Sequence, residues 1–213
     1  MLGDTVRGIG LQAALSNAPV VIHLAGGAKG DDLAAGHLVS AALTTDVRHL
    51  ILISVIGADI MPINYFRTKL AAEEAVKTSG VPYTIIRVAQ VHDFVRGALG
   101  VLTKSPLIPV PSGLRLEPVS AETVAQELVA RALGEPSQRV PDLAGPEILD
   151  AHQLVAHFQR ARALNTWTVP VRLPGAAGRA YRRGDNLAGQ PVQRRGETWK
   201  EYPESVFPQD VND

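Results

Sequence analysis

Three short apolar runs, separated by two segments with helical spacing, organise the first half of the chain. The runs are Ala18–Gly26, His49–Ala58 and Pro82–Ala89, and valine, isoleucine and leucine dominate them. Runs of this length and character are typical of strands that are buried on both faces. The intervening segments 31–43 and 65–80 place apolar residues three and four positions apart, which predicts helices. Alternating strands and helices require right-handed crossovers, so the pattern predicts an α/β fold with a parallel sheet.

The pattern becomes less regular in the second half. Segment 102–120 is rich in proline and glycine, which predicts a loop with short extended pieces. A helix is predicted next, with Ser120 as its N-cap and Gly134 at its end. A strand and a helix beginning near Asp150 follow, and the tail from Thr166 predicts small helices and one strand.

The amino-acid composition limits the kinds of partner that the chain is expected to bind. The 21 basic residues balance the 21 acidic ones, which argues against nucleic acid and against an anionic membrane surface. The chain has no cysteine and no apolar run of about 18 residues. We therefore expect a cytoplasmic protein whose partner is a small molecule or another protein. No spacing of histidine, aspartate and glutamate suggests a metal site.

Tyr65 and Lys69 are the first candidates for chemistry. They stand four residues apart in a predicted helix, so both side chains project from one face. An ammonium beside a phenol would lower the pKa of the phenol and make it a usable proton donor and acceptor. The alternative is that both residues lie on a solvated helix face.

Two further polar residues lie within the apolar runs. Ser54 follows "ILI" at the end of its run, where catalytic groups of parallel sheets gather, and could donate a hydrogen bond to a substrate carbonyl. Its hydroxyl could equally satisfy a neighbouring backbone group. His23 is interpreted as a packed core residue and not as a ligand.

The order of several pieces carries a family resemblance. The pieces are "VVIHLAGG", "VRHLILISVIGAD", "YFRTKLAAEEAVKTSGVPYTIIRVAQVHDF" and "RVPDLAGPEILDAHQLV". Together they resemble the atypical short-chain dehydrogenases/reductases, in particular the NmrA-like NAD(P)-binding branch. The resemblance implies that Tyr65 protonates a substrate carbonyl as hydride arrives from the nicotinamide. It implies that Lys69 also holds the nicotinamide ribose.

The same resemblance implies a set of cofactor-binding residues. "HLAGG" resembles the segment that lines the adenosine, "RVAQVHDF" the stretch beside the nicotinamide, and "LGDTVRG" the segment with the acidic residue that caps the adenine. Besides Lys69, the residues placed at NAD(P) in this way are Asp4, Leu24, Ala25, Gly26, Val88, Ala89 and Gln90.

The sequence departs from the family pattern at two places. Ser54 precedes Tyr65 by only eleven residues, a tighter spacing than in classical members. The glycine-rich loop that binds the pyrophosphate at a helix N-terminus is expected upstream of Asp4, where the chain begins. "AGGAKG", Ala25–Gly30, is an alternative phosphate loop between a strand and a helix, but no acidic residue ends the next strand.

These observations give one expected architecture. It is a Rossmann-like, doubly wound parallel sheet that is N-terminally incomplete, with a small C-terminal substrate lobe. Residues 1–134 are predicted to form a partial NAD(P)-binding domain that lacks its first βαβ unit and includes a loop at 100–119. Residues 135–213 are predicted to form a cap segment packed on it.

The function implied is an NAD(P)-dependent oxidoreductase that reduces a carbonyl or acts on a sugar-type or isoprenoid-type substrate. A non-catalytic NAD(P)-binding regulator is the alternative. A third reading, from the missing loop, is that NAD(P) binding is weak or absent in this chain. The missing first strand would also leave Pro19–Ala25 as an open apolar edge, so the chain is expected either to self-associate through it or to be poorly soluble.

Overall fold

The computed structural model describes residues 3–27 and 30–202. These residues fall into two compact units. The first unit is bounded by Met1–Val88 and Ala125–Asp142, and the second by Ala89–Val124 and Leu143–Asp213.

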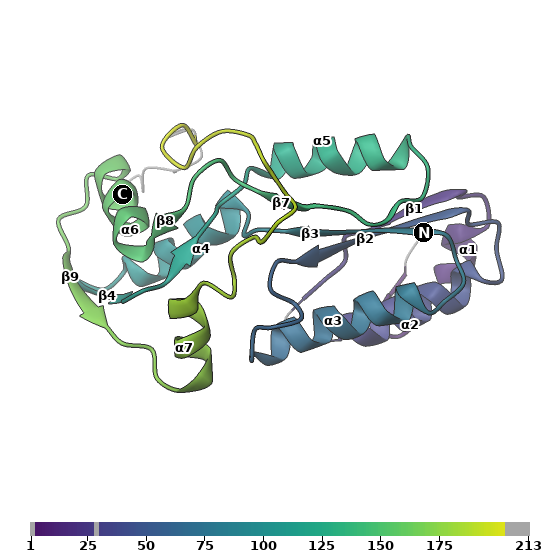
Figure 1. The fold of residues 1–213 in the computed structure, drawn as a ribbon, viewed down its shortest axis with the longest axis horizontal. Coiled ribbons are helices and arrows are strands. Elements are labelled where there is room, and N and C mark those ends of the chain that lie inside the picture. Colours follow the sequence, from purple (N-terminus) through teal and green to yellow (C-terminus); the bar gives the residue numbers. More distant parts are fainter. Residues whose placement is uncertain (1–2, 28–29, 203–213) are drawn as a thin grey trace, which may run out of the picture. The chain divides into compact units, whose positions relative to one another are not determined.

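The first unit is a layered α/β structure. Its elements, in chain order, are α1 (Leu11–Leu15), β1 (Val20–His23), α2 (Asp31–Ala42), β2 (His49–Val55), α3 (Asn64–Lys77), β3 (Tyr83–Val88), α5 (Ala121–Ala132, most of which belongs to this unit) and β6 (Gln138–Arg139). The strands are parallel in the order β1-β2-β3, and β6 also pairs with β3. Helices α2 and α3 cover one face of these strands and α5 lies on the other (Figure 1). The predicted α/β fold with its parallel sheet is therefore confirmed.

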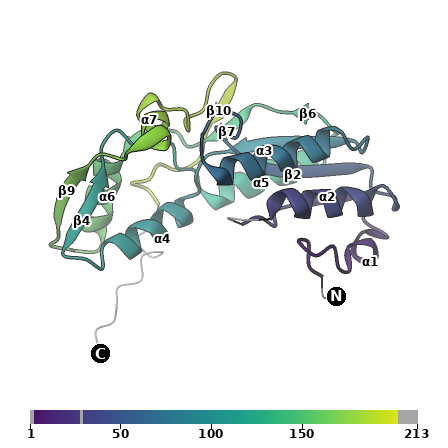
Figure 2. The same cartoon turned by 90° about the horizontal axis from the view of Figure 1, so that it is seen from below.

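Side-chain alternation along β2 explains the two covered faces. Leu50 and Leu52 point toward α2 and α3, where they join Val76 and Ile85 in one apolar cluster. Ile51 points to the opposite face and is also completely buried. A strand that is buried on both faces must be apolar at nearly every position, which is why the run reads as continuous and not as alternating. Figure 2 shows α2 and α3 side by side along these strands.

Strand β1 lies at the margin of this sheet. Among residues 3–27 and 30–202 it pairs with β2 alone. Val20 and Ile22 are more than one third exposed, whereas Val21 packs against the apolar cluster. Self-association through Pro19–Ala25 stays a prediction, which light scattering on the purified chain would test.

The second unit has its own small core. Its elements are α4 (His92–Leu102), β4 (Leu107–Pro111), β5 (Arg115–Leu116), β7 (Asp142–Ala144), β8 (Leu149–Asp150), α6 (Ala151–Ala161), β9 (Trp167–Val171), α7 (Gly175–Arg183) and β10 (Val192–Arg194). Strands β4 and β9 are parallel, and β5 and β8 are antiparallel. Ile108, Leu154 and Phe158 are at the centre of the core. The helix predicted to begin near Asp150 is α6, and Asp150 caps it in a capping box with Gln153.

Helix α4 was not predicted. Its sequence contains Gly97 and Gly100, which have low helix propensity. Val95 and Leu99, spaced by four, enter the core of the second unit. Burial of this apolar face outweighs the weak local propensity.

The two units divide the chain at points other than residue 134. Segment 100–119, which was assigned to the first domain, belongs to the second unit, and residues 135–142 belong to the first. Strand β6 explains part of this difference, because Gln138 and Arg139 pair with Thr84 and Ile85 of β3. Such returns of the chain depend on long-range pairing, which local patterns do not reveal.

No helix in the described part of the chain is both long and apolar enough to cross a membrane. The same residues hold no group of three or more metal-ligating side chains that could bind a metal ion.

Candidate functional site

A polar cluster forms in the first unit where β1 ends and where α2 and α3 begin. His23 is the last residue of β1, Asp31 is the first of α2, and Tyr65 is the second of α3. The carboxyl ends of parallel strands are where ligands bind in open α/β sheets. The cluster is therefore in the part of the fold where a site is expected.

Tyr65 and Lys69 come together as predicted from their spacing. The Lys69 Nζ atom lies 5.9 Å from the centroid of the Tyr65 ring. The side chain of Lys69 is 11% exposed and Tyr65 is partly buried, so the pair does not lie on a solvated helix face. The structure brings the two side chains together, while their roles in catalysis stay a prediction.

Asp31 is a member of the cluster that the sequence analysis missed. Its Oδ2 atom lies 2.6 Å from Lys69 Nζ, and its Oδ1 atom accepts a hydrogen bond from the Gly27 N–H at 2.7 Å. The Asp31 side chain is only 5% exposed, so this ion pair is buried. The sequence signal that could have identified Asp31 is an acidic residue at a predicted helix start, directly after a glycine-rich segment.

Gly26 has a steric reason to be glycine. A Cβ atom at this position would lie 2.7 Å from Lys69 Nζ and 3.3 Å from Asp31 Oδ2. The missing side chain therefore lets the ion pair lie directly against the backbone that follows β1. Residues Leu24 to Gly27 are exposed, so a ligand could reach this segment.

The expected lowering of the Tyr65 pKa is wrong for the cofactor-free protein. Burial raises the pKa of the Tyr65 phenol, and the negative charge of Asp31 raises it further. The expectation assumed an unpaired ammonium, whereas the charge of Lys69 is opposed by a carboxylate at contact distance.

His23 is a neutral neighbour of the same cluster. Its side chain is buried, as the sequence analysis predicted for a core residue. Burial lowers its pKa most, the Lys69 charge lowers it further, and Asp31 opposes these effects. Because the net shift is downward, His23 carries no charge near neutral pH.

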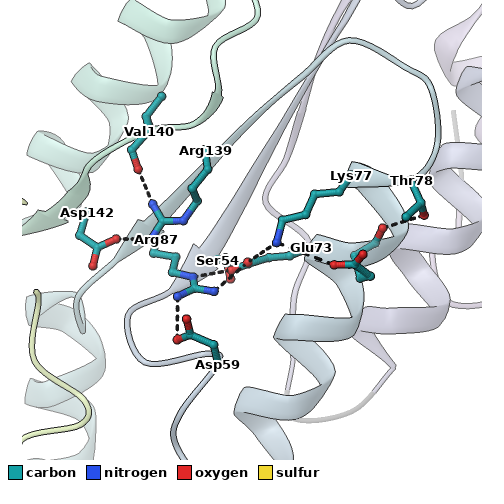
Figure 3. Close-up of polar contacts among 10 residues, drawn as sticks. Ser54, Asp59, Glu73, Lys77, Thr78, Arg87, Arg139, Val140 and Asp142 are labelled. Atoms are coloured by element: carbon teal, nitrogen blue, oxygen red, sulfur yellow. Dashed lines mark hydrogen bonds and ion pairs between the residues drawn. The ribbon is translucent and has the colours of Figure 1, made fainter. Parts of the chain in front are cut away.

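Ser54 has a different partner from either one considered in the sequence analysis. Its side chain points from β2 toward α3, and its Oγ donates a 2.6 Å hydrogen bond to Glu73 Oε1 (Figure 3). Ser54 is 6% exposed and Glu73 is completely buried. The hydroxyl hydrogen is thus already engaged by a carboxylate, which argues against its donation to a substrate carbonyl.

Glu73 belongs to a second ionic cluster, which lies one helical turn beyond Lys69. Arg87 of β3 binds it in a bidentate manner, with Nε 2.7 Å from Oε1 and Nη2 2.9 Å from Oε2. The third guanidinium nitrogen, Nη1, donates to Asp59 at 2.8 Å, and Lys77 Nζ lies 3.5 Å from Glu73 (Figure 3). Ser54 and Arg87 are register partners on adjacent strands, which is why one carboxylate reaches both.

The remaining predicted cofactor residues have ordinary surroundings. Asp4 accepts a hydrogen bond from the Arg7 N–H at 3.0 Å and so closes a turn. Val88 is buried at the end of β3, next to Val55. In the second unit, the Ala89 N–H donates to Leu143, and the Gln90 side-chain oxygen is buried without a hydrogen-bond partner.

The alternative phosphate loop, Ala25–Gly30, is only partly described, because residues 28 and 29 lie outside the described residues. Helix α2 after it begins with Asp31 and Asp32. Negative side chains at a helix N-terminus oppose a pyrophosphate there, and the Gly27 N–H is already bound to Asp31. The described geometry therefore argues against this loop as a phosphate site.

Comparison with known proteins supports a nucleotide-binding fold. Residues 3–136 match the family model described as NAD(P)H-binding. No curated protein matches the chain significantly.

Solved structures of similar fold include enzymes of two kinds. A nucleoside-diphosphate-sugar epimerase from Staphylococcus aureus has 19% identity and a TM-score of 0.75, covering 94% of this chain and 81% of its own. The NADPH-dependent quinone oxidoreductase QOR2 of Escherichia coli, complexed with NADPH, has 14% identity and a TM-score of 0.78, covering 97% and 82%. Triphenylmethane reductase of a Citrobacter species has 20% identity and a TM-score of 0.70, covering 88% and 74%. At these identities the likeness establishes the fold alone.

Proposed function

Because the chain belongs to the NAD(P)H-binding family, as the resemblance to the NmrA-like short-chain dehydrogenases/reductases predicted, we propose that it is an NAD(P)-dependent oxidoreductase. Its proposed reaction is reduction of a substrate carbonyl. The observation that carries the proposal is the partly buried Tyr65–Lys69 pair beside the exposed backbone that follows β1.

The nicotinamide, when bound, would supply a hydride to the carbonyl carbon. Tyr65 would donate its phenolic proton to the carbonyl oxygen, and the ammonium of Lys69 would offset the negative charge left on the phenolate. The raised pKa of Tyr65 keeps the proton on the side chain at neutral pH but makes the phenol a weaker acid than an exposed tyrosine. Leu24, Ala25 and Gly26 would hold the nucleotide through their exposed backbone.

Cofactor affinity is a separate part of the proposal. Binding of NADH or NADPH by a polypeptide of these 213 residues is proposed to be weak, about millimolar or weaker. Among the described residues, the start of α2 holds the Asp31 carboxylate where a pyrophosphate would need N–H donors. Losing several charge-assisted hydrogen bonds at about 1.5–3 kcal/mol each offsets most of a micromolar affinity. Calorimetric titration with NADH and NADPH tests this, and micromolar binding would contradict it.

The Tyr65→Phe variant tests the enzymatic function. Oxidation of NADPH and NADH is followed with a panel of quinones, aldehydes and ketones; quinones are included because a protein of similar fold is named as a quinone oxidoreductase. Turnover in Tyr65→Phe is expected to fall about 10²–10⁴-fold because the proton donor is lost, while cofactor affinity is unchanged. Lys69→Met is expected to weaken both. Full activity in Tyr65→Phe would contradict the proposal.

A second candidate function is a non-catalytic NAD(P)-binding regulator. The engagement of Ser54 by Glu73 favours it, since a third catalytic side chain is then missing from the described site. Cofactor binding without turnover of any panel substrate would support this alternative.

A further inference from the structure

The Lys69 ammonium contacts the carboxylate of Asp31, and the ring of Tyr65 lies further from the same ammonium. The Asp31 Oδ2 atom is 2.6 Å from Lys69 Nζ, whereas the centroid of the Tyr65 ring is 5.9 Å away. The Oδ2 atom has no hydrogen-bond partner among the described residues, so the ion pair is its polar contact. Both charged side chains are nearly buried, which strengthens their interaction relative to a surface pair.

The backbone around Asp31 fixes the direction of its carboxylate. The Oδ1 atom is held by the Gly27 N–H at 2.7 Å, which leaves Oδ2 for Lys69. A Cβ atom at position 26 would lie 2.7 Å from Lys69 Nζ, so a side chain there would displace the tip of the lysine. The local structure is therefore built around the Asp31–Lys69 pair.

We propose, resting on the function proposed above, that Asp31 is a positioning residue of the site. It holds the ammonium of Lys69 against Gly26 and thereby keeps Tyr65 as a neutral, proton-donating phenol. Asp31 touches neither a reacting atom nor the Tyr65 hydroxyl in this role, and it acts through Lys69 and through its charge.

Three ionisable side chains of the described residues belong to the same cluster as Tyr65. Lys69 comes from α3, Asp31 from α2 and His23 from β1. Because His23 is neutral near pH 7, the net field on the phenol depends on the other two charges. The direction of the Tyr65 shift agrees, since the charge of Asp31 adds to the effect of burial.

The test is a titration of Tyr65 in the cofactor-free protein. Tyrosinate formation is followed by ultraviolet absorbance, and the curve of Tyr65→Phe is subtracted to isolate this residue from Tyr83, Tyr181 and Tyr202. Asp31→Asn is expected to lower the pKa of Tyr65, because the opposing carboxylate is removed while the ammonium remains. Asp32→Asn is the matched control, since it removes the same charge from the same helix start and is expected to leave the titration unchanged.

A second variant keeps the test decisive if Asp31→Asn does not fold. Asp31→Asn/Lys69→Met removes both charges and leaves no unpaired buried ion. If Asp31 acts more strongly on the phenol than Lys69, the pKa of Tyr65 falls below that of the wild type. A rise would show that Lys69 dominates and would overturn the inference, as would an unchanged value in Asp31→Asn.

The titration needs neither cofactor nor substrate, so its outcome is independent of the proposed reaction. A downward shift together with full activity in Tyr65→Phe would keep the role of Asp31 and reject the oxidoreductase. An unchanged titration together with an inactive Tyr65→Phe would do the reverse.

Discussion

Two buried ion pairs lie one helical turn apart on α3, and they differ in how completely their carboxylates are satisfied. Lys69 pairs with Asp31, and Glu73 pairs with Arg87. Each carboxylate oxygen of Glu73 accepts a hydrogen bond from the Arg87 guanidinium. Ser54 donates a further hydrogen bond, and Lys77 forms an ion pair with the same carboxylate. Among the residues that the structure describes, Asp31 has one backbone donor and one ammonium.

The Glu73 carboxylate has hydrogen bonds to both of its oxygens, as expected for a buried charge with a structural role. Burial alone would raise the pKa of Glu73, but the hydrogen bonds from Arg87 and Ser54 outweigh it, and the net pKa is lowered. Burial likewise opposes the charge of Arg87, yet Glu73 and Asp59 raise its pKa. Both groups are therefore held in their charged forms and tie α3 to β2 and β3.

The Asp31–Lys69 pair differs because it lies beside an ionisable phenol and an exposed stretch of backbone. The charge of Asp31 affects the protonation of the neighbouring Tyr65. The charges of the Glu73 cluster are instead paired with one another. One helix therefore carries a side-chain stripe, Tyr65, Lys69, Glu73 and Lys77, with a candidate site at its beginning and a structural anchor further along.

Removing the Glu73 carboxylate is expected to lower the free energy of unfolding more than any other substitution proposed here. Glu73→Ala leaves the Arg87 guanidinium buried without its main partner, and we expect a loss of about 3–5 kcal/mol in the free energy of unfolding. Urea unfolding followed by circular dichroism measures it. Glu74→Ala is the matched control, because its side chain is 63% exposed and its Lys77 contact is 3.8 Å long, so a change of at most about 1 kcal/mol is expected. Equal losses in both variants would contradict the structural role of Glu73.

Ser54→Ala sharpens the division between anchor and site. The variant removes a hydrogen bond to a buried carboxylate, which is worth about 1.5–3 kcal/mol, so stability should fall by that amount. Cofactor affinity in calorimetry should be unchanged. If turnover is lost instead and the unfolding curve stays in place, Ser54 serves the chemistry as the sequence analysis first suggested.

The pH dependence of stability should report the Glu73 cluster. A lowered folded-state pKa means that Glu73 binds protons more weakly in the folded protein than in the unfolded chain. Its contribution is therefore present above the unfolded pKa of about 4.3 and is lost as the pH falls through the lower folded-state pKa. We expect urea midpoints of the wild type to fall across this acid range and those of Glu73→Gln to fall less. If the urea midpoints of the wild type and of Glu73→Gln fall equally with pH, the acid sensitivity comes from other carboxylates.

Asp59→Asn is expected to have the smallest effect. Burial opposes the charge of Asp59, but its hydrogen bond with Arg87 lowers its pKa overall. Its side chain is 54% exposed, so solvent screens the pair, and we expect a loss of at most about 1 kcal/mol in the free energy of unfolding. A loss as large as that of Glu73→Ala would show that Arg87 depends equally on both carboxylates.

The sequence by itself determined the alternating strands and helices from β1 to β3 and the proximity of Tyr65 to Lys69. Each of these is a local property. Continuous apolar runs indicate strands buried on both faces, and the helical repeat places residues i and i+4 one turn apart whatever surrounds them. For the same reason the start of a helix near Asp150 could be predicted from nearby residues.

Only the tertiary structure decided which partners these side chains have. Asp31 meets Lys69 across 38 positions of sequence, because α2 and α3 lie side by side on one face of the sheet. Ser54 meets Glu73 for a related reason, since the sheet register sets Ser54 beside Arg87 beneath the same helix. Charges depend strongly on distance and burial, so the state of the Tyr65 phenol follows from helix packing that no local pattern specifies.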